Sequence, residues 1–325
     1  MGAGNISQVS RSLAEDLKIA EDLARCVGPK TVIRRYEPMS KRTTMRVGGC
    51  ARLWVEPATD EDVLAVVQSA KKQKVPLTVV GRGSNLLVLD AGISGITLHP
   101  AGGHFERIDF KPDGRIEAGA GTRLKKLVMS ARGRERGGLE FMEGIPGDVG
   151  GALRMNAGAM GSAVFDVIES VRYIDRRGKR HDAKPGQMGV SYRNCEALEG
   201  GIALSAVFKT TPSTRAQIDE KLKIYEKKRW ESQPAKPSSG CIFKNTASIP
   251  AGKLIDELKL KGLRFGDAVV SDLHGNFIVN AGSATAHDVL QLIELIKERV
   301  RQARGIELET EVVILGDENF FPTIS

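Results

Sequence analysis

Gly144-Ile145-Pro146-Gly147-Asp148-Val149-Gly150-Gly151-Ala152 is the stretch that decides the fold, and it runs on to Asn156-Ala157-Gly158. Four glycines and a proline in its first eight residues argue against regular secondary structure. Glycine lets a ligand lie against the backbone, and consecutive free N–H groups can converge on a phosphate as an anion-binding nest. A flexible surface loop is the alternative, but it would not need the apolar residues Ile145, Val149 and Ala152. The stretch therefore predicts a buried loop against a phosphate-bearing cofactor.

The size and composition are those of an ordinary globular protein. The 325 residues are enough for two or three domains with hydrophobic cores of their own. The sequence contains neither an apolar run of about 18 residues nor a basic-then-apolar signal pattern at its start. We therefore expect a cytoplasmic protein with no membrane partner.

The charge and the cysteines narrow the class of partner. A net charge of +8 favours an anionic partner, either nucleic acid or a phosphorylated small molecule. Aromatic residues make up 5% of the chain and do not alternate with the basic runs, which argues against nucleic acid. Cys26, Cys50, Cys195 and Cys241 lie far apart and form no C-x-x-C pair, so we expect neither a metal site nor a disulfide framework.

A second glycine-rich turn, Gly81-Arg82-Gly83-Ser84-Asn85-Leu86, follows a predicted buried strand at residues 75–80. Before it, residues 43–51 predict a short strand broken by Gly48-Gly49, and residues 59–70 predict a helix capped by Thr59 and Asp62. The β-α-β order suggests a dinucleotide site, but Leu86 stands where the Rossmann fingerprint needs its third glycine. What remains is a turn whose N–H groups, Ser84 hydroxyl and Asn85 amide can face a pyrophosphate. A simple polar turn is the alternative.

The rest of the chain predicts a β-rich segment and then a mixed segment. Strands are expected at residues 96–98, 105–110, 115–118, 171–174 and 202–208, with a helix capped by Thr122. Helices are expected at residues 216–230 and from Thr285 onward, and a strand with alternating acids at residues 307–316. Between them, Ser238-Ser239-Gly240-Cys241 places one reactive side chain after small polar residues. That order is typical of a catalytic turn, and a buried structural cysteine is the alternative.

Together these stretches resemble one family over nearly the whole chain: the UDP-N-acetylenolpyruvoylglucosamine reductases, flavoenzymes that complete UDP-N-acetylmuramate in peptidoglycan synthesis. The resemblance is carried by Thr44 with Gly48-Gly49, residues 81–86, residues 144–158, Ser191-Tyr192-Arg193, residues 237–245 and Glu311-Val312. The distance between Tyr192 and Cys241 resembles that of the shorter, second branch of the family.

The resemblance implies an α+β fold with three functional segments. Residues 1–100 would form an α/β FAD-binding subdomain, preceded by a helical extension at 1–40, and residues 101–212 a β-rich FAD-binding subdomain. Together they would make a fold of the vanillyl-alcohol-oxidase (PCMH) type. Residues 213–325 would form an α+β substrate-binding domain. The protein is expected to be a monomer.

The resemblance also implies a set of cofactor contacts and a reaction. NADPH would reduce a non-covalent FAD, and the enolpyruvyl group of the UDP-sugar would then take the hydride. The residues expected to bind FAD are Thr44, Gly48, Gly49, Gly81, Arg82, Gly83, Ser84, Asn85, Leu86, Gly144, Ile145, Pro146, Gly147, Gly150, Gly151, Ala152, Asn156, Ala157 and Gly158.

Three residues are implied to be catalytic. Arg193 would hold the substrate carboxylate, Glu311 would assist it, and Cys241 would donate the proton at a position where most members of the family carry serine. The implied substrate contacts are Tyr192, Arg229, Gln233, Lys244 and Asn245. Two rival functions remain: another FAD-dependent oxidoreductase of the same fold, and a basic nucleic-acid-binding protein.

Overall fold

The structure is a computed structural model, and it describes residues 3–316. These residues form two compact units, each made of stretches that are distant in the sequence. The first unit contains the chain up to residue 37 together with residues 51–81 and 94–219. The second contains residues 38–50, residues 82–93 and the chain from residue 220 onward. The mixture of helices and sheets within both units confirms the α+β class.

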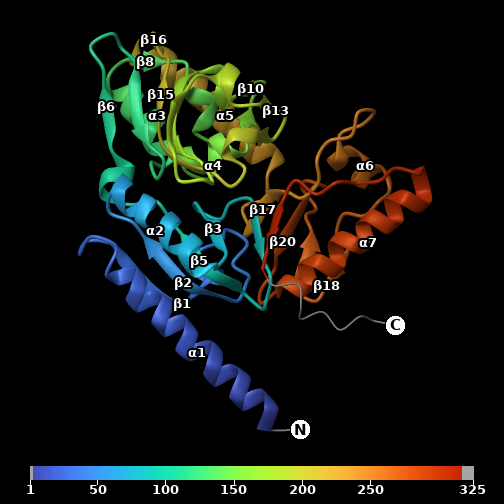
Figure 1. Ribbon diagram of the computed structural model, residues 1–325. Coiled ribbons are helices and arrows are strands. Elements are labelled where there is room, and N and C mark those ends of the chain that lie inside the picture. The colour runs from blue at the N-terminus through green and yellow to red at the C-terminus, as the bar shows by residue number, and fades with distance from the viewer. Residues whose placement is uncertain (1–2, 317–325) are drawn as a thin grey trace. The chain divides into compact units, whose positions relative to one another are not determined.

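The first unit opens with a helix and a four-stranded sheet (Figure 1). α1 (Ala3–Ala24) is followed by β1 (Val32–Pro38), β2 (Cys50–Glu56), α2 (Asp60–Gln73), β3 (Leu77–Val79) and β5 (Ile93–Leu98), and the strand order is β1-β2-β5-β3. The predicted capping box is confirmed, because Thr59 and Asp62 bond each other's backbone N–H groups at the start of α2. The apolar face of α2, with Val63 and Val66, packs with Leu53 of β2 in one buried cluster.

A five-stranded antiparallel sheet forms the rest of this unit. Its strands are β6 (Ile108–Phe110), β7 (Ile116–Gly119), β11 (Ile168–Ile174), β12 (Arg180–Ala183) and β15 (Ile202–Phe208), in the order β12-β11-β15-β7-β6. Around it lie α3 (Leu124–Gly133), α4 (Val149–Arg154) and the strand pairs β8 (Arg136–Gly137) with β16 (Thr211–Pro212), β9 (Gly158–Ala159) with β10 (Ser162–Ala163), and β13 (Val190–Ser191) with β14 (Asn194–Cys195). The 3₁₀ helices are η1 (Met39–Lys41), η2 (Gly103–Glu106), η3 (Glu140–Met142), η4 (Val164–Asp166), η5 (Pro185–Gln187) and η6 (Glu196–Leu198).

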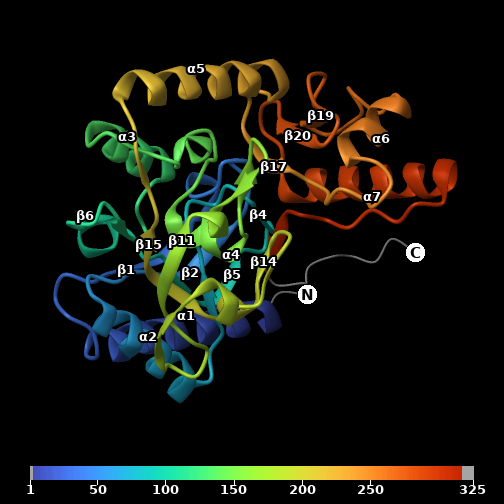
Figure 2. The same cartoon turned by 90° about the horizontal axis from the view of Figure 1, so that it is seen from above.

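The second unit is a four-stranded antiparallel sheet packed against helices. β17 (Ser238–Cys241), β18 (Arg264–Phe265), β19 (Ala268–Val270) and β20 (Phe277–Asn280) lie in the order β17-β20-β19-β18. Figure 2 shows α7 (Ala286–Arg304) and α6 (Ala251–Glu257) beside these strands. α5 (Arg215–Ser232) precedes them, and β4 (Leu86–Val88) pairs in parallel with β21 (Val313–Leu315). The predicted cap at Thr285 is confirmed, and Ile293, Ile296 and Val300 of α7 are buried in the core of this unit.

Four predicted elements differ from the structure. Residues 43–47, predicted as a strand, form a turn in which the Thr44 N–H donates to Gly83 O at 3.2 Å. Residues 103–106 form η2, so only β6 remains of the strand predicted at 105–110. The strand predicted at 307–316 is reduced to β21, because the Glu311 N–H donates to Ile242 O instead. α3 is capped by Arg123 rather than Thr122, whose hydroxyl donates to Arg107 O at 3.2 Å.

β3 is also shorter and less buried than predicted. The sequence predicted a buried strand over residues 75–80, but β3 covers three residues, and Val79 is 39% exposed. The reason is its place at the edge of the sheet, where it pairs only with β5.

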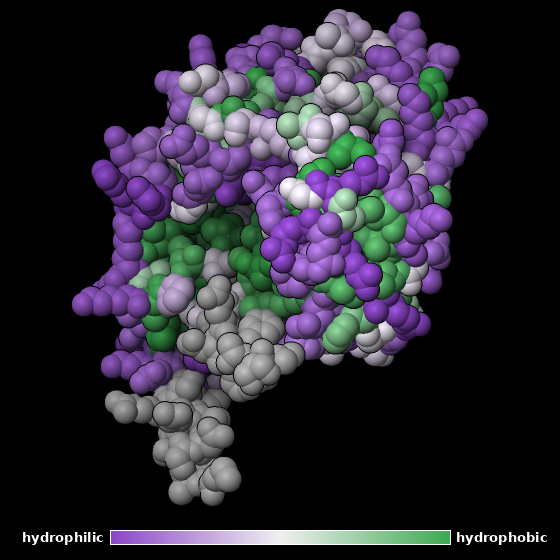
Figure 3. Space-filling view, turned by 90° about the vertical axis from the view of Figure 1, so that its right-hand side faces the viewer, coloured by the Kyte–Doolittle hydropathy of each residue, from purple (hydrophilic) through white to green (hydrophobic). Residues whose placement is uncertain are grey.

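Within residues 3–316, no helix combines the length and the apolar character needed to span a membrane. Hydrophilic side chains cover much of the face drawn in Figure 3, and hydrophobic ones gather in separate areas of it.

Candidate active site

The glycines of the first turn are required by the close approach of other chain segments. A Cβ at Gly81 would lie 2.8 Å from both carboxylate oxygens of Asp148, so the start of this turn touches the second glycine-rich stretch. Gly83 has a φ of +65°, and a Cβ there would lie 2.3 Å from Arg42 O. Gly48 and Gly49 are equally crowded: a Cβ on them would lie 2.7 Å from Val88 and 2.3 Å from the backbone of residue 90, respectively. Only glycine fits these positions.

Hydrogen bonds within the second stretch and to residues 120–122 occupy its backbone N–H groups. Asp148 is the N-cap of α4, and its side chain accepts the Gly151 N–H at 2.9 Å. The Gly150 N–H donates to Ala120 O at 2.7 Å, and the Val149 N–H donates to Thr122 O at 3.0 Å. These three N–H groups are therefore not the free anion nest that the sequence suggested. Residues 144–148 form the expected loop, but the stretch then continues into the short helix α4, which its glycines had argued against. Val149 and Ala152 are buried as expected, whereas Ile145 is only half-buried.

The end of this stretch lies beside the predicted carboxylate clamp. Asn156 has a φ of +38°, and its amide donates to Ser191 O at 3.0 Å. A Cβ on Gly158 would lie 3.3 Å from a guanidinium nitrogen of Arg193. Arg193 itself has a φ of +57°, and its guanidinium carbon lies 5.0 Å from the centre of the Tyr192 ring. The first unit thus brings part of the predicted cofactor loop next to Tyr192 and Arg193.

The second unit brings Cys241 and Glu311 onto neighbouring segments. Cys241 ends β17 and is paired with Phe277 of β20. The next residue, Ile242, accepts the Glu311 N–H at 2.7 Å. Phe243 forms a bridge with Thr310, and both Cys241 and Glu311 are half-buried. Two residues that are 70 positions apart in the sequence are therefore held by one backbone ladder.

The predicted substrate residues of this unit are more scattered. The Lys244 ammonium group lies 3.0 Å from a Glu309 carboxylate oxygen, and the Lys244 side chain is 43% exposed. Asn245 is exposed, and its side-chain oxygen accepts the Ala251 N–H at the start of α6. Arg229 and Gln233 lie at and just beyond the C-terminal end of α5, where both are half-buried.

Asn276 is a residue of this site that the sequence did not identify. Its side chain is 2% exposed, accepts the Phe243 N–H at 2.9 Å and donates to Phe243 O at 2.8 Å. Its backbone carbonyl accepts the Ile242 N–H at 2.9 Å. Asn276 therefore clamps the segment that follows Cys241. Asn276 lies in a predicted loop, and no local sequence pattern predicts that its side chain bonds a remote segment.

His274 supports Asn276 from within the same loop. Its ring nitrogen Nδ1 accepts the Asn276 N–H at 3.1 Å. Burial lowers the pKa of His274, and the nearby charge of Lys261 lowers it further. The neutral ring is therefore favoured, which leaves Nδ1 able to accept.

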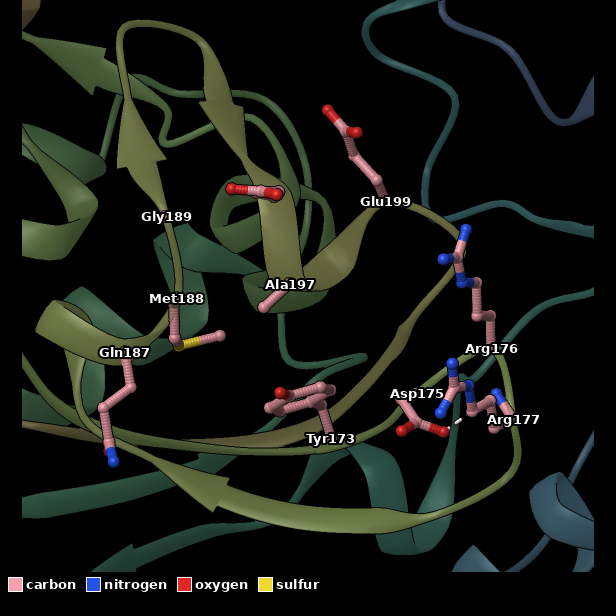
Figure 4. A pocket seen from close by; sticks show the side chains of 10 residues that line it. Tyr173, Asp175, Arg176, Arg177, Gln187, Met188, Gly189, Ala197 and Glu199 are labelled. Carbon is pink, nitrogen blue, oxygen red and sulfur yellow. Dashed lines mark hydrogen bonds between the residues drawn. The ribbon is translucent and has the colours of Figure 1, made fainter.

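A pocket of about 480 Å³ lies elsewhere in the first unit (Figure 4). Tyr173, Arg176, Met188 and Glu199 are among the residues that line it, and none of the predicted site residues does so. Asp175 at its edge accepts N–H groups of Lys179 and Arg177 and contacts His181, and these bonds lower its pKa to about 2. The pocket contains none of the residues of the predicted chemistry, so its volume does not locate the active site.

Comparison with known proteins matches two parts of the chain to described families. Residues 51–184 match an FAD binding domain, and residues 233–315 match the C-terminal domain of UDP-N-acetylenolpyruvoylglucosamine reductase.

Individual relatives match most of the chain. The UDP-N-acetylenolpyruvoylglucosamine reductase of Bacillus pumilus is 41% identical over 286 residues, which are 87% of this chain and 94% of that protein. That of Geobacter metallireducens is 41% identical over 88% of this chain and 95% of its own. The crystal structure of the Thermus caldophilus reductase superposes with a TM-score of 0.76 at 36% identity, covering 88% of this chain and 99% of that one.

Proposed function

The chain belongs to the UDP-N-acetylenolpyruvoylglucosamine reductase family, and from this premise we propose how its own residues divide the work of the reaction. The protein is an FAD-dependent oxidoreductase of peptidoglycan synthesis. It uses NADPH to reduce the enolpyruvyl group of UDP-N-acetylglucosamine enolpyruvate to UDP-N-acetylmuramate. The observation that carries our assignment of roles is the backbone ladder that places Cys241 beside Glu311.

The donor groups of the first turn suit the diphosphate of FAD. Arg82 is an exposed cation, Ser84 offers a half-buried hydroxyl, and the positive φ of Gly83 keeps the turn free of side-chain bulk. We propose that residues 81–86, Thr44, Gly48 and Gly49 hold FAD together with residues 144–158. FAD, when bound, accepts a hydride from NADPH and gives it to the substrate.

Arg193 is proposed to hold the substrate carboxylate. Hydride addition to the enolpyruvyl group leaves negative charge on the neighbouring carbon and on that carboxylate. A guanidinium can donate two parallel hydrogen bonds to a carboxylate, and the contact of Arg193 with the Tyr192 ring restrains its side chain. Removing a donor of this kind costs about 3 kcal/mol in transition-state stabilisation, by analogy with one oxyanion donor.

Cys241 is proposed as the acid that completes the reaction. A thiol carries a proton that it can pass to the carbanion. The thiolate left behind then regains a proton from solvent. Glu311, on the neighbouring segment, is proposed to assist by interacting with the reacting end of the substrate.

The remaining contacts are proposed by chemistry. Arg229 and Lys244 supply cations for the diphosphate of the UDP-sugar, and Tyr192, Gln233 and Asn245 supply hydrogen-bonding groups. We also propose that the protein acts in the cytoplasm as a monomer. None of the four cysteines forms a disulfide, which suits a reducing compartment, and sedimentation of the purified protein tests the monomer.

The function is tested on the purified full-length protein. A flavin absorption spectrum and NADPH oxidation that depends on the enolpyruvyl sugar nucleotide are expected. The alternative, another FAD-dependent oxidoreductase of this fold, is favoured by the opposite result: flavin reduction followed by reoxidation that the sugar nucleotide does not accelerate.

Cys241→Ala tests the assigned acid. The Cys241 thiol is proposed to donate its proton only after hydride transfer to the substrate, so reduction of the flavin by NADPH should proceed at the wild-type rate. Reoxidation by the enolpyruvyl substrate should slow by about 100-fold or more, as expected for the loss of a general acid. Cys241→Ser is the matched control, because a hydroxyl can transfer the same proton, and it should retain much of the activity. If both half-reactions of Cys241→Ala proceed at the wild-type rates, the thiol has no part in the mechanism.

A further inference from the structure

Asn85 makes a contact that its place in the glycine-rich turn does not explain. Its side-chain amide donates a hydrogen bond to the backbone carbonyl of Glu311 at 3.0 Å, across 226 positions of sequence. Asn85 and Glu311 are both half-buried. A residue of the turn proposed to hold FAD therefore also holds the backbone of a proposed catalytic carboxylate.

This bond extends a strand pairing beyond its end. β4 and β21 run parallel, with Leu86 opposite Val313, and the Val313 N–H donates to Asn85 O at 3.0 Å. Glu311 lies two residues before β21, where the regular ladder has ended. The Asn85 amide supplies there the donor that another strand residue would supply, and it is a neutral donor suited to a carbonyl oxygen.

Glu311 is held on its other side by the Cys241 segment. Its N–H donates to Ile242 O at 2.7 Å, and the Lys244 N–H donates to Glu309 O at 2.9 Å. The Glu311 peptide thus spans two anchors, Asn85 and Ile242. If the Asn85 anchor is lost, one side of Glu311 is released while the bonds to Ile242 remain.

We propose that Asn85 is a positioning residue for protonation. Its amide fixes Glu311 relative to Cys241, so that the turn at residues 81–86 helps to hold the site of the proposed acid in place. The inference rests on the proposed roles of Cys241 and Glu311. Asn85 acts here through Glu311, so its removal affects the step that follows hydride transfer. A residue that only bound FAD would affect both half-reactions.

The test compares Asn85→Ala and Asn85→Asp with a matched control, Asn280→Asp, in the flavin-loaded enzyme. Aspartate keeps the shape of asparagine, but its oxygens repel the Glu311 carbonyl. Asn280 belongs to the same unit, and its buried amide donates to Met45 O at 3.2 Å. The control keeps its acceptor bonds to the N–H groups of Gly282 and Ala284.

The first readout is amide hydrogen exchange of the peptide covering residues 309–315. We expect exchange at Glu311 and Val313 to accelerate about 10-fold or more in both Asn85 variants and to stay at the wild-type rate in Asn280→Asp. The second readout is rapid mixing, normalised to bound flavin. Reoxidation by the enolpyruvyl sugar nucleotide should slow about 10-fold or more beyond any slowing of the reduction by NADPH, and the pH profile of that reoxidation should shift.

Each other outcome overturns the inference. Wild-type exchange at residues 309–315 shows that the bond does not hold Glu311, and equal slowing of both half-reactions assigns Asn85 to FAD alone. If Asn85→Ala does not fold, Asn85→Ser, with a shorter donor, is compared in the same way. Failure of the proposed function looks different: the wild-type flavin would then not be reoxidised by the sugar nucleotide, whatever the exchange rates of the variants.

Discussion

The loop at residues 144–158 and the segment at residues 241–245 both belong to the proposed active site, yet they are held by different kinds of contact. Within the first, the Asp148 side chain accepts the Gly151 N–H, and the Ala157 N–H donates to Ala152 O at 2.9 Å. The two residues joined by each of these hydrogen bonds lie a few positions apart. The Cys241 segment is held by Asn276, Glu309 and Glu311, which are distant in the sequence. The cap of α4 is thus a local contact, although the Gly150 and Val149 N–H groups bond Ala120 O and Thr122 O, whereas the clamp on the Cys241 segment is tertiary throughout. We expect their mutational sensitivity to differ accordingly.

The largest effect is expected at Gly83, where a local constraint and a tertiary one coincide. Gly83→Ala must accept a positive φ and place its Cβ 2.3 Å from Arg42 O and 2.8 Å from Thr43 Cα. We expect a loss of about 4 kcal/mol or more in the free energy of unfolding, or protein that is purified without flavin.

The matched control for this substitution is Gly161→Ala. Gly161 also has a positive φ, +84°, but no atom lies within 4 Å of an added Cβ. It should lose only the conformational term, about 1 kcal/mol. Urea unfolding of both variants gives the difference, and equal losses would show that the close approach at Gly83 has no energetic weight.

The second prediction concerns the tertiary clamp. Asn276→Ala leaves the buried N–H and C=O groups of Phe243 without their side-chain partners, and each such group costs about 1–3 kcal/mol. We expect a loss of about 3 kcal/mol in the free energy of unfolding, measured in urea. Asn276→Asp keeps the acceptor for the Phe243 N–H and should lose less. A loss under about 1 kcal/mol in Asn276→Ala would mean that the segment is held without the clamp.

The third prediction concerns the local cap. Asp148→Ala removes the acceptor for the Gly151 N–H at the start of α4, and the loss of an N-cap costs about 1 kcal/mol. Asparagine caps helices about as well, so Asp148→Asn should recover most of the stability. If Asp148→Ala proves as damaging as Asn276→Ala, the distinction between local and tertiary organisation is not supported.

The same distinction explains what the sequence could predict. The caps at Thr59 and Thr285 and the α+β class follow from patterns within a few residues, and the structure confirms them. The glycine-rich stretch is a loop only over residues 144–148, because Asp148 caps the short helix α4 that follows. The family resemblance added the roles of Cys241 and Glu311, which stay predictions. The clamp by Asn276 depends on pairing between remote segments, and no local pattern encodes such pairing. The strands predicted at residues 43–47 and 307–312 failed for the same reason, since their backbone groups bond remote loops.

The smallest effect is expected from pH, through His274. Its ring lies against α6, where a Cβ on Gly252 would be 2.8 Å from the ring carbon Cε1, and burial lowers its pKa below the usual value of about 6.5. The unfolded chain therefore binds a proton more readily than the folded protein. Stability is complete above about pH 6.5 and falls as the pH drops below it, by at most about 1.4 kcal/mol per pH unit. Between pH 7 and 5.5 His274 should therefore contribute a loss of stability.

His274→Asn isolates this contribution. The asparagine side-chain oxygen can take the place of Nδ1 as acceptor for the Asn276 N–H, but it does not titrate. The free energies of unfolding of wild type and variant, measured in urea at pH 7 and 5.5, should show a smaller pH dependence in the variant. Protonation of His274 opposes the bond to Asn276. The rate of flavin reoxidation by substrate should therefore fall between pH 7 and 5.5, and it should fall more in wild type than in the variant. Reduction by NADPH depends on no member of this clamp and should show no such difference. Identical pH dependence in both proteins would remove His274 from the support of the Cys241 segment.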